Sequence, residues 1–200
     1  MRRIIAVLGA LALVIGLSGC GYNQIQSLDE ATRSSWSEVV NQYQRRADLI
    51  PNLVNTVKGF ADQEREVLIA VTEARSRVGQ IKVDPTNPGS LEQFEQAQAS
   101  VGSALSRLLV VAENYPQLKS DANFRDLQAQ LEGTENRIAV ARKRYIDSVQ
   151  QYNVLVRQVP VNLTAMVFGY QAKPQFTVAN EAAIAKPPTV TFERPASTPK

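Results

Sequence analysis

Residues 44–54 read QRRADLIPNLV, and the interpretation of the whole chain starts from them. They lie within a long series of apolar residues spaced three or four apart, which is the pattern of an amphipathic helix. Yet the stretch holds two adjacent arginines, Arg45 and Arg46, and a proline, Pro51. A proline inside a helix removes a backbone hydrogen bond and costs about 3 kcal/mol, so a plain surface helix is not expected to keep one.

The apolar spacing continues on both sides of Pro51, from Trp36 to Val78. No glycine or turn cluster accompanies the proline, so the pattern predicts one long helix over residues 28–78, kinked at Pro51 rather than folded back there. A capping box that begins at Ser27 marks the start of this helix.

Two further long helices are predicted downstream. Residues 79–89 contain DPTNPG and form a loop. Ser90 caps a helix over 91–114, which ends because the residue before a proline avoids helical geometry. A third helix starts at Ser120 or Asp121 and stops at Pro160.

The remaining chain predicts a short fourth helix, capped by Asn162 and ending at Phe168 before a glycine. Residues 171–178 look extended, and residues 179–200 hold four of the ten prolines, which indicates a disordered tail. The predicted fold class is all-α: an elongated, up-and-down antiparallel helical bundle of three long helices plus a short fourth, over residues 28–178.

Composition excludes several kinds of function. The chain has 22 basic and 19 acidic residues, and two of the basic residues lie in a segment expected to be removed. The net charge of the remaining chain is therefore close to zero, which argues against a nucleic-acid-binding surface. Histidine is absent and there is one cysteine, which excludes an internal disulfide and the usual histidine-based zinc sites and triads. We expect no metal, no cofactor and no nucleic-acid partner.

The N-terminus has the features of a lipoprotein signal. The apolar run Ile4–Leu17 has 14 residues, which is short for a membrane span of about 20 residues and typical of a signal peptide. Leu17-Ser18-Gly19-Cys20 then has the pattern of a lipobox. We expect a signal peptide over residues 1–19, a lipidated Cys20 and a membrane tether over residues 20–27. The alternative is an uncleaved signal anchor. Both place the body outside the cytoplasm, in the periplasm where an outer membrane exists.

Several short motifs occur together along residues 22–178. Beside the quoted stretch they are Tyr22-Asn23, Trp36, Ala112–Pro116, Leu127–Leu131, Glu135 with Arg142, and Tyr152-Asn153. In this combination the chain resembles the LemA family of bacterial envelope proteins. One departure is Ile146, where the family is associated with asparagine. The resemblance implies a helical, membrane-attached protein whose bulk is extracytoplasmic, and it implies no established reaction.

Two charged residues fall at inward positions of the apolar series. Arg46 is one, and Glu113 or Glu135 is its candidate partner, because an unpaired buried charge is very costly. Glu64 is the other, with Arg142 or Arg107 as its candidate partner. The functional alternative is that Arg45 and Arg46 grip a ligand. The candidate structural or partner-binding motif comprises Arg45, Arg46, Asp48, Pro51, Asn52, Glu113, Glu135 and Arg142.

The first half of the long helix carries a second candidate site. Helix lengths predict that the later helices do not reach its apolar face, formed by Trp36, Val39, Val40 and Tyr43. An apolar face of this size usually marks an interface. A second copy of the chain or an integral membrane protein is the expected partner, and the alternative is that the chain after Pro160 folds down and covers the face.

Three functions are compatible with the sequence. The first is a non-catalytic scaffold or adaptor that binds another envelope protein. The second is an envelope hydrolase acting through carboxylates alone, for example Glu113 with Glu135. The third is a protein that acts directly on the membrane through an apolar helix face. We expect no catalytic residue, because no nucleophile or base is positioned by a known motif.

Lipidation gives the first prediction. Replacing the only cysteine, Cys20→Ser, should leave an unprocessed precursor, because the acyl acceptor is lost. The measurement is incorporation of radiolabelled palmitate in cells, with the unaltered chain as the control. Equal labelling of both chains would contradict the prediction.

Overall fold

The computed structural model describes the backbone of residues 2–176 and the side chains of residues 21–176. The predicted tail over 179–200 lies outside this part of the chain. All the regular elements described are α-helices, which confirms the predicted fold class. In chain order they are α1 (Arg2–Phe60), α2 (Arg65–Gln80), α3 (Pro88–Glu113), α4 (Pro116–Ser120), α5 (Ala122–Leu155) and α6 (Val161–Phe168).

Helix α1 passes through Pro51 without a hairpin, as predicted. A proline has no N–H, so Pro51 cannot donate to the carbonyl of Ala47 four residues earlier. That carbonyl instead accepts a 2.9 Å hydrogen bond from Nε of Arg75 on α2. The proline thus leaves an acceptor open on α1, and the neighbouring helix fills it.

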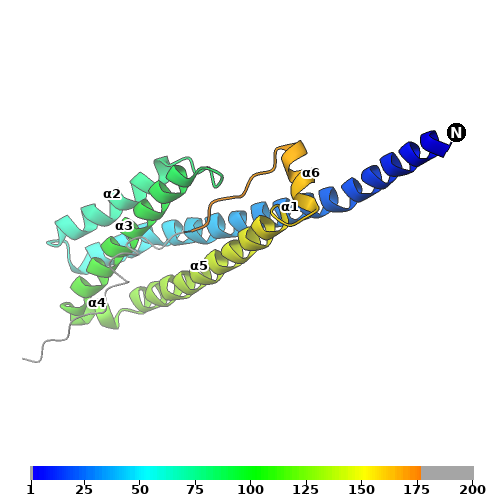
Figure 1. Cartoon of the computed structure of the whole chain (residues 1–200). Coiled ribbons are helices and arrows are strands. Elements are labelled where there is room, and N and C mark those ends of the chain that lie inside the picture. Colours follow the sequence, from blue (N-terminus) through cyan, green and yellow to red (C-terminus); the bar gives the residue numbers. More distant parts are fainter. Residues whose placement is uncertain (1, 177–200) are drawn as a thin grey trace, which may run out of the picture.

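The prediction of one helix over residues 28–78 is wrong, because the chain reverses after Phe60. Residues 61–64 form a turn in which the N–H of Glu64 bonds to the carbonyl of Ala61 at 3.0 Å. Helix α2 then runs back along α1 (Figure 1). Its apolar residues continue the three-and-four spacing of α1, so periodicity alone did not reveal the turn.

The predicted helix start at Ser27 is also wrong, because residues 20–27 belong to α1. Ile25 within this segment is fully buried and packs with Tyr152 and Leu155 of α5. Asp29, two residues after Ser27, forms ion pairs with Arg33 at 3.1 Å and with Lys173 at 2.7 Å.

The N-terminal cap predicted for α5 is confirmed, and those predicted for α3 and α6 are wrong. Asp121 caps α5, accepting from the backbone N–H of Phe124 at 2.9 Å, as expected. The cap of α3 is Asn87 and not Ser90, and no side chain caps α6, so the role given to Asn162 is wrong.

Helix α5 ends at Leu155, five residues before the predicted limit at Pro160. Gly169 ends α6 with φ of 74°, a conformation that favours glycine.

The helices form two closely packed pairs, α1 with α5 and α2 with α3 (Figure 1). Helix α5 runs antiparallel to α1, because Arg46 lies opposite Glu135 and Ser35 lies opposite Ser148. At the end of the molecule far from the N-terminus the pairs share one apolar core, to which α4 adds Leu118. Toward the N-terminus the body narrows to α1, α5 and α6, and α1 extends beyond them.

Residues 170–176 form an arm that returns from α6 along the body (Figure 1). The amide of Asn153 bonds to both the N–H and the carbonyl of Lys173, at 2.7 and 2.8 Å. The ammonium group of Lys173 reaches Asp29 on α1, and Phe176 is buried. The arm is therefore fixed to α5 through the backbone of Lys173, to α1 through the ammonium group of Lys173, and to the body by burial of Phe176.

The carbonyl of Ala47 gives a prediction. Arg75→Ala should lower the free energy of unfolding by about 1 kcal/mol, because a hydrogen bond between α1 and α2 is lost. The same change should cost less in a Pro51→Ala chain, where the new backbone N–H bonds to Ala47 within the helix. Denaturant unfolding, followed by circular dichroism, measures the loss of unfolding free energy in each background, and exposed Arg77→Ala is the matched control. An equal cost of Arg75→Ala in the two backgrounds would refute the coupling.

Candidate functional site

The side chain of Arg46 lies at the centre of the bundle and is only 4% exposed. One Nη atom donates to Glu135 on α5 at 3.0 Å, and the other donates to the carbonyl of Gln98 on α3 at 3.2 Å and to its side-chain oxygen. This confirms Glu135 as the partner of Arg46. Glu113 is exposed at the end of α3 and has no ion pair among the side chains of residues 21–176. One guanidinium therefore ties three helices together.

A second ion pair joins α5 to α3. Arg142 lies 3.5 Å from Glu95, whose side chain is buried. Burial raises the pKa of Glu95, and the guanidinium of Arg142 partly opposes this rise. The prediction that Glu64 pairs with Arg142 or Arg107 is wrong. Arg142 pairs with Glu95, and Glu64 forms no ion pair among the side chains of residues 21–176 but accepts a 3.0 Å hydrogen bond from the hydroxyl of Tyr115.

Tyr43 is buried near both ion pairs. Its ring lies edge-on to Phe94 with centroids 5.2 Å apart, and the guanidinium of Arg46 lies 5.0 Å from the ring centroid. Burial raises the pKa of Tyr43, whereas the charges of Arg142 and Arg46 lower it. The phenol therefore stays neutral, and its ring packs against the guanidinium of Arg46.

An aromatic cluster continues from Tyr43 toward the arm. Trp36 contacts Phe94, Tyr145 and Phe176, with centroid distances between 5.2 and 5.8 Å. Phe176 also packs beneath the guanidinium of Arg142, which lies 4.7 Å from its ring centroid. Burial raises the pKa of Tyr145 to about 12, and its hydroxyl has no hydrogen-bond partner among the described residues.

These contacts correct the predicted interface on α1. Val39 and Tyr43 are buried within the chain itself, and Trp36 is half-buried. The alternative, that the chain after Pro160 covers this face, is right for Trp36, which Phe176 contacts. Only Val40 remains largely open, with 40% of its surface exposed.

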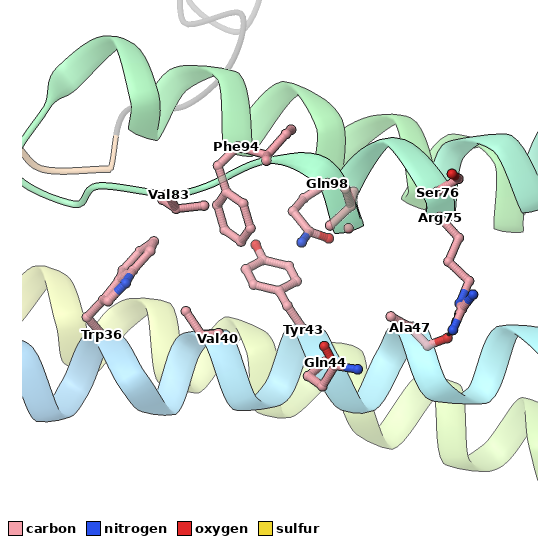
Figure 2. A pocket seen from close by; sticks show the side chains of 13 residues that line it. Trp36, Val40, Tyr43, Gln44, Ala47, Arg75, Ser76, Val83, Phe94 and Gln98 are labelled. Atoms are coloured by element: carbon pink, nitrogen blue, oxygen red, sulfur yellow. Dashed lines mark hydrogen bonds between the residues drawn. The ribbon is translucent and has the colours of Figure 1, made fainter.

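A cleft of about 550 Å³ opens beside this cluster, between α1, α2, α3 and the loop that joins α2 to α3. Figure 2 shows Trp36, Val40 and Val83 at one end of it and Ser76 and Arg75 at the other. Its walls are apolar and aromatic over most of their length, with polar groups from Gln44, Ser76, Arg75 and Gln98. An apolar cavity with a few polar groups is the usual form of a binding site.

The other residues of the predicted motif take no part in the ion network. Arg45, Asp48 and Asn52 are exposed. Asp48 accepts a 2.8 Å hydrogen bond from Gln44 on the same helix, and the backbone carbonyl of Asn52 accepts from Thr56. Arg45 and Arg46 therefore point in different directions and do not form a joint grip on one ligand.

The contributors to the site that were not predicted from sequence include Glu95, Gln98, Arg75 and Phe176. Gln98 lies four residues after Phe94 and three before Val101, and Glu95 lies four residues after Leu91, so helical spacing places both on the inward face and was a signal that they are buried. No feature of the sequence indicated that Arg75 bonds to the carbonyl of Ala47 or that Phe176 contacts Trp36.

The structure offers no support for a carboxylate pair at the two predicted glutamates. Glu135 is bound to Arg46, Glu113 is exposed at the end of α3, and neither lines the cleft. Among the described residues, no cluster of three or more acidic or cysteine side chains is placed to hold a metal ion. Within the same part of the chain, no helix is both long and apolar enough to cross a membrane.

The burial of Arg46 gives a prediction. Arg46→Ala should lower the free energy of unfolding by about 2–4 kcal/mol, because the Gln98 groups lose their donor and Glu135 loses its cation. The half-exposed Glu135 is partly solvated afterwards, which keeps the loss below that of a fully buried pair. Arg45→Ala, at the exposed neighbour, is the matched control and should change stability by less than about 0.5 kcal/mol. Equal effects of the two changes in urea unfolding would contradict this account.

Three known proteins match most of the length of this chain. The chain is 25% identical over 192 residues to Magnetosome protein MamQ 2 and to Magnetosome protein MamQ 1 of Paramagnetospirillum magneticum, covering 86% of this chain and 70% of each relative. It is 24% identical over 191 residues to Magnetosome protein MamQ of Magnetospirillum gryphiswaldense, with the same coverage. Residues 35–192 match the sequence model of the LemA family. The chain belongs to the LemA family.

Proposed function

We propose that the protein is a membrane-anchored, extracytoplasmic adaptor that holds an apolar segment of another envelope protein in the cleft between α1, α2 and α3. The observation that carries this proposal is the open, aromatic-walled cleft next to a buried ion network. Its relatives are named as magnetosome proteins, and those names state no reaction.

The walls of the cleft are held in place before any partner binds. Arg46 fixes α1 to α3 through Gln98, and Arg75 fixes α2 to α1 through the carbonyl of Ala47. A preformed cleft binds more tightly, because less conformational entropy is lost on binding. The exposed surface of Val40 and the half-buried ring of Trp36 supply the apolar contact.

Arg75 defines the chemistry of the partner further. Its Nε is used by Ala47, and it forms no ion pair among the side chains of residues 21–176. Arg75 lines the polar end of the cleft (Figure 2). A partner segment with two or three apolar side chains followed by a carboxylate would match the cleft, because the apolar side chains would pack at the end with Val40 and the carboxylate would pair with Arg75.

The distance from the anchor favours a polypeptide as the ligand rather than lipid. Val40 lies twenty residues after Cys20 along one continuous helix, which places it about 30 Å away. In the anchored protein, the cleft would therefore lie outside the bilayer. The bound segment would belong to the extracytoplasmic part of its protein.

A photocrosslinking amino acid at Val40 tests the proposal in intact cells. Val140 on α5 has similar exposure outside the cleft and is the matched control position. A defined adduct should form at position 40 and not at position 140. The crosslinked segment should be apolar with an acidic residue, and a synthetic peptide of that segment should bind the purified chain.

A second variant makes this test specific. Val40→Glu should weaken binding of the captured peptide at least about tenfold, or about 1.4 kcal/mol, because a charge enters the apolar end of the cleft. Val140→Glu should leave binding unchanged. Equal adducts at the two positions, or a second copy of this chain as the captured partner, would overturn the proposed adaptor role.

A further inference from the structure

Helix α6 exposes an apolar surface that the rest of the fold does not use. Its sequence is VNLTAMVF, and only Thr164 and Ala165 are buried. The side chains that remain outward are between 58% and 79% exposed, and they are Leu163, Met166, Val167 and Phe168. Four large apolar side chains on so short a helix form a patch that soluble surfaces rarely carry without a partner.

This patch lies at the end of the body from which the N-terminal part of α1 extends (Figure 1). Val161 packs against Gly21, where an added Cβ would lie 3.1 Å from a Val161 methyl group. Gly21 follows the apolar run Ile4–Leu17 by four residues, which is about 6 Å along a helix. Because Gly21 directly follows Cys20, the patch lies where the proposed lipid anchor would hold the chain at the membrane surface.

The surroundings of α6 match the composition of a membrane–water boundary. Residues 158–172 contain no charged residue, and Arg157 and Lys173 flank them. Tyr22 on α1 contacts Phe168, with centroids 4.8 Å apart, and lies 6.3 Å from Tyr170. Tyrosine is enriched at this depth, because its ring is apolar and its hydroxyl stays hydrated.

We infer that α6 lies in the lipid interface, with Leu163, Met166, Val167 and Phe168 among the headgroups and the upper acyl chains. An interfacial helix of this kind buries its apolar face by about 5–10 Å. Because α6 also packs on α1, its contact with lipid sets the angle at which the body and its cleft stand on the membrane. The inference rests on the proposed membrane anchoring and adds a second point of contact to it.

Tryptophan quenching by brominated lipids tests this in the full-length chain, reconstituted in phosphatidylcholine vesicles brominated near the top of the acyl chains. Phe168→Trp adds a fluorophore on α6. Val110→Trp adds one at an exposed site of α3 near the opposite end of the body and is the matched control. The unaltered chain gives the background from Trp36, the only native tryptophan. Circular dichroism verifies that both variants keep the native helical content.

The expected result is loss of most of the added emission in Phe168→Trp and none in Val110→Trp. If Phe168→Trp is unquenched while the chain still floats with the vesicles, anchoring stands and the inference about α6 is wrong. Blue-shifted but unquenched emission would place a protein partner or second copy on α6, which also overturns the inference. A chain that fails to float at all would refute both the anchoring and the lipid contact.

Discussion

The guanidinium of Arg46 is a permanent charge inside the bundle, and three helices are arranged to satisfy it. A guanidinium has five N–H donors in a planar group. Glu135 on α5 supplies the anion, and Gln98 on α3 supplies two neutral oxygens. Close helix pairing occurs within α1–α5 and within α2–α3, so long side chains such as Arg46, Tyr43 and Phe94 span the space between the pairs. The cleft occupies part of the same space, so the interaction that holds the pairs together also fixes the walls of the cleft.

Pro51, five residues after Arg46, also contributes to the contact between the two helix pairs, because it frees the backbone carbonyl of Ala47. A carbonyl freed inside a helix needs another donor when it is buried, and α2 supplies that donor with Arg75. The stretch 44–54 therefore contacts each of the other long helices by a different chemistry: an ion pair to α5, charge-assisted hydrogen bonds to α3 and a side-chain-to-carbonyl bond to α2. This explains why two features that are unfavourable in an isolated helix, a buried charge and an interior proline, occur five residues apart.

The spacing of apolar residues along a helix was enough to predict which side chains face inward. The turn after α1 and the arm over Trp36 depend on contacts that this spacing does not encode. Arg46 was predicted to be inward and paired because its position falls in the apolar series, and Glu135 was one of two candidates. The turn at residues 61–64 was missed because α2 repeats the apolar spacing of α1. The cover over Trp36 could be stated only as an alternative. The cover depends on the arm, which Asn153 and Asp29 hold through Lys173. Lys173 lies 20 residues from Asn153 in the sequence and much farther from Asp29.

Arginine-selective NMR tests the central claim most directly, because it observes the guanidinium N–H groups themselves. The account predicts that Arg46 gives separate, slowly exchanging Nη protons at neutral pH. Glu135→Gln or Gln98→Ala should speed their exchange, and the adjacent, exposed Arg45 should give one averaged, fast-exchanging signal in every chain. If the Arg46 side chain exchanges as fast as that of Arg45, the guanidinium is not held between α3 and α5. The tie between the two helix pairs would then have to come from apolar packing alone.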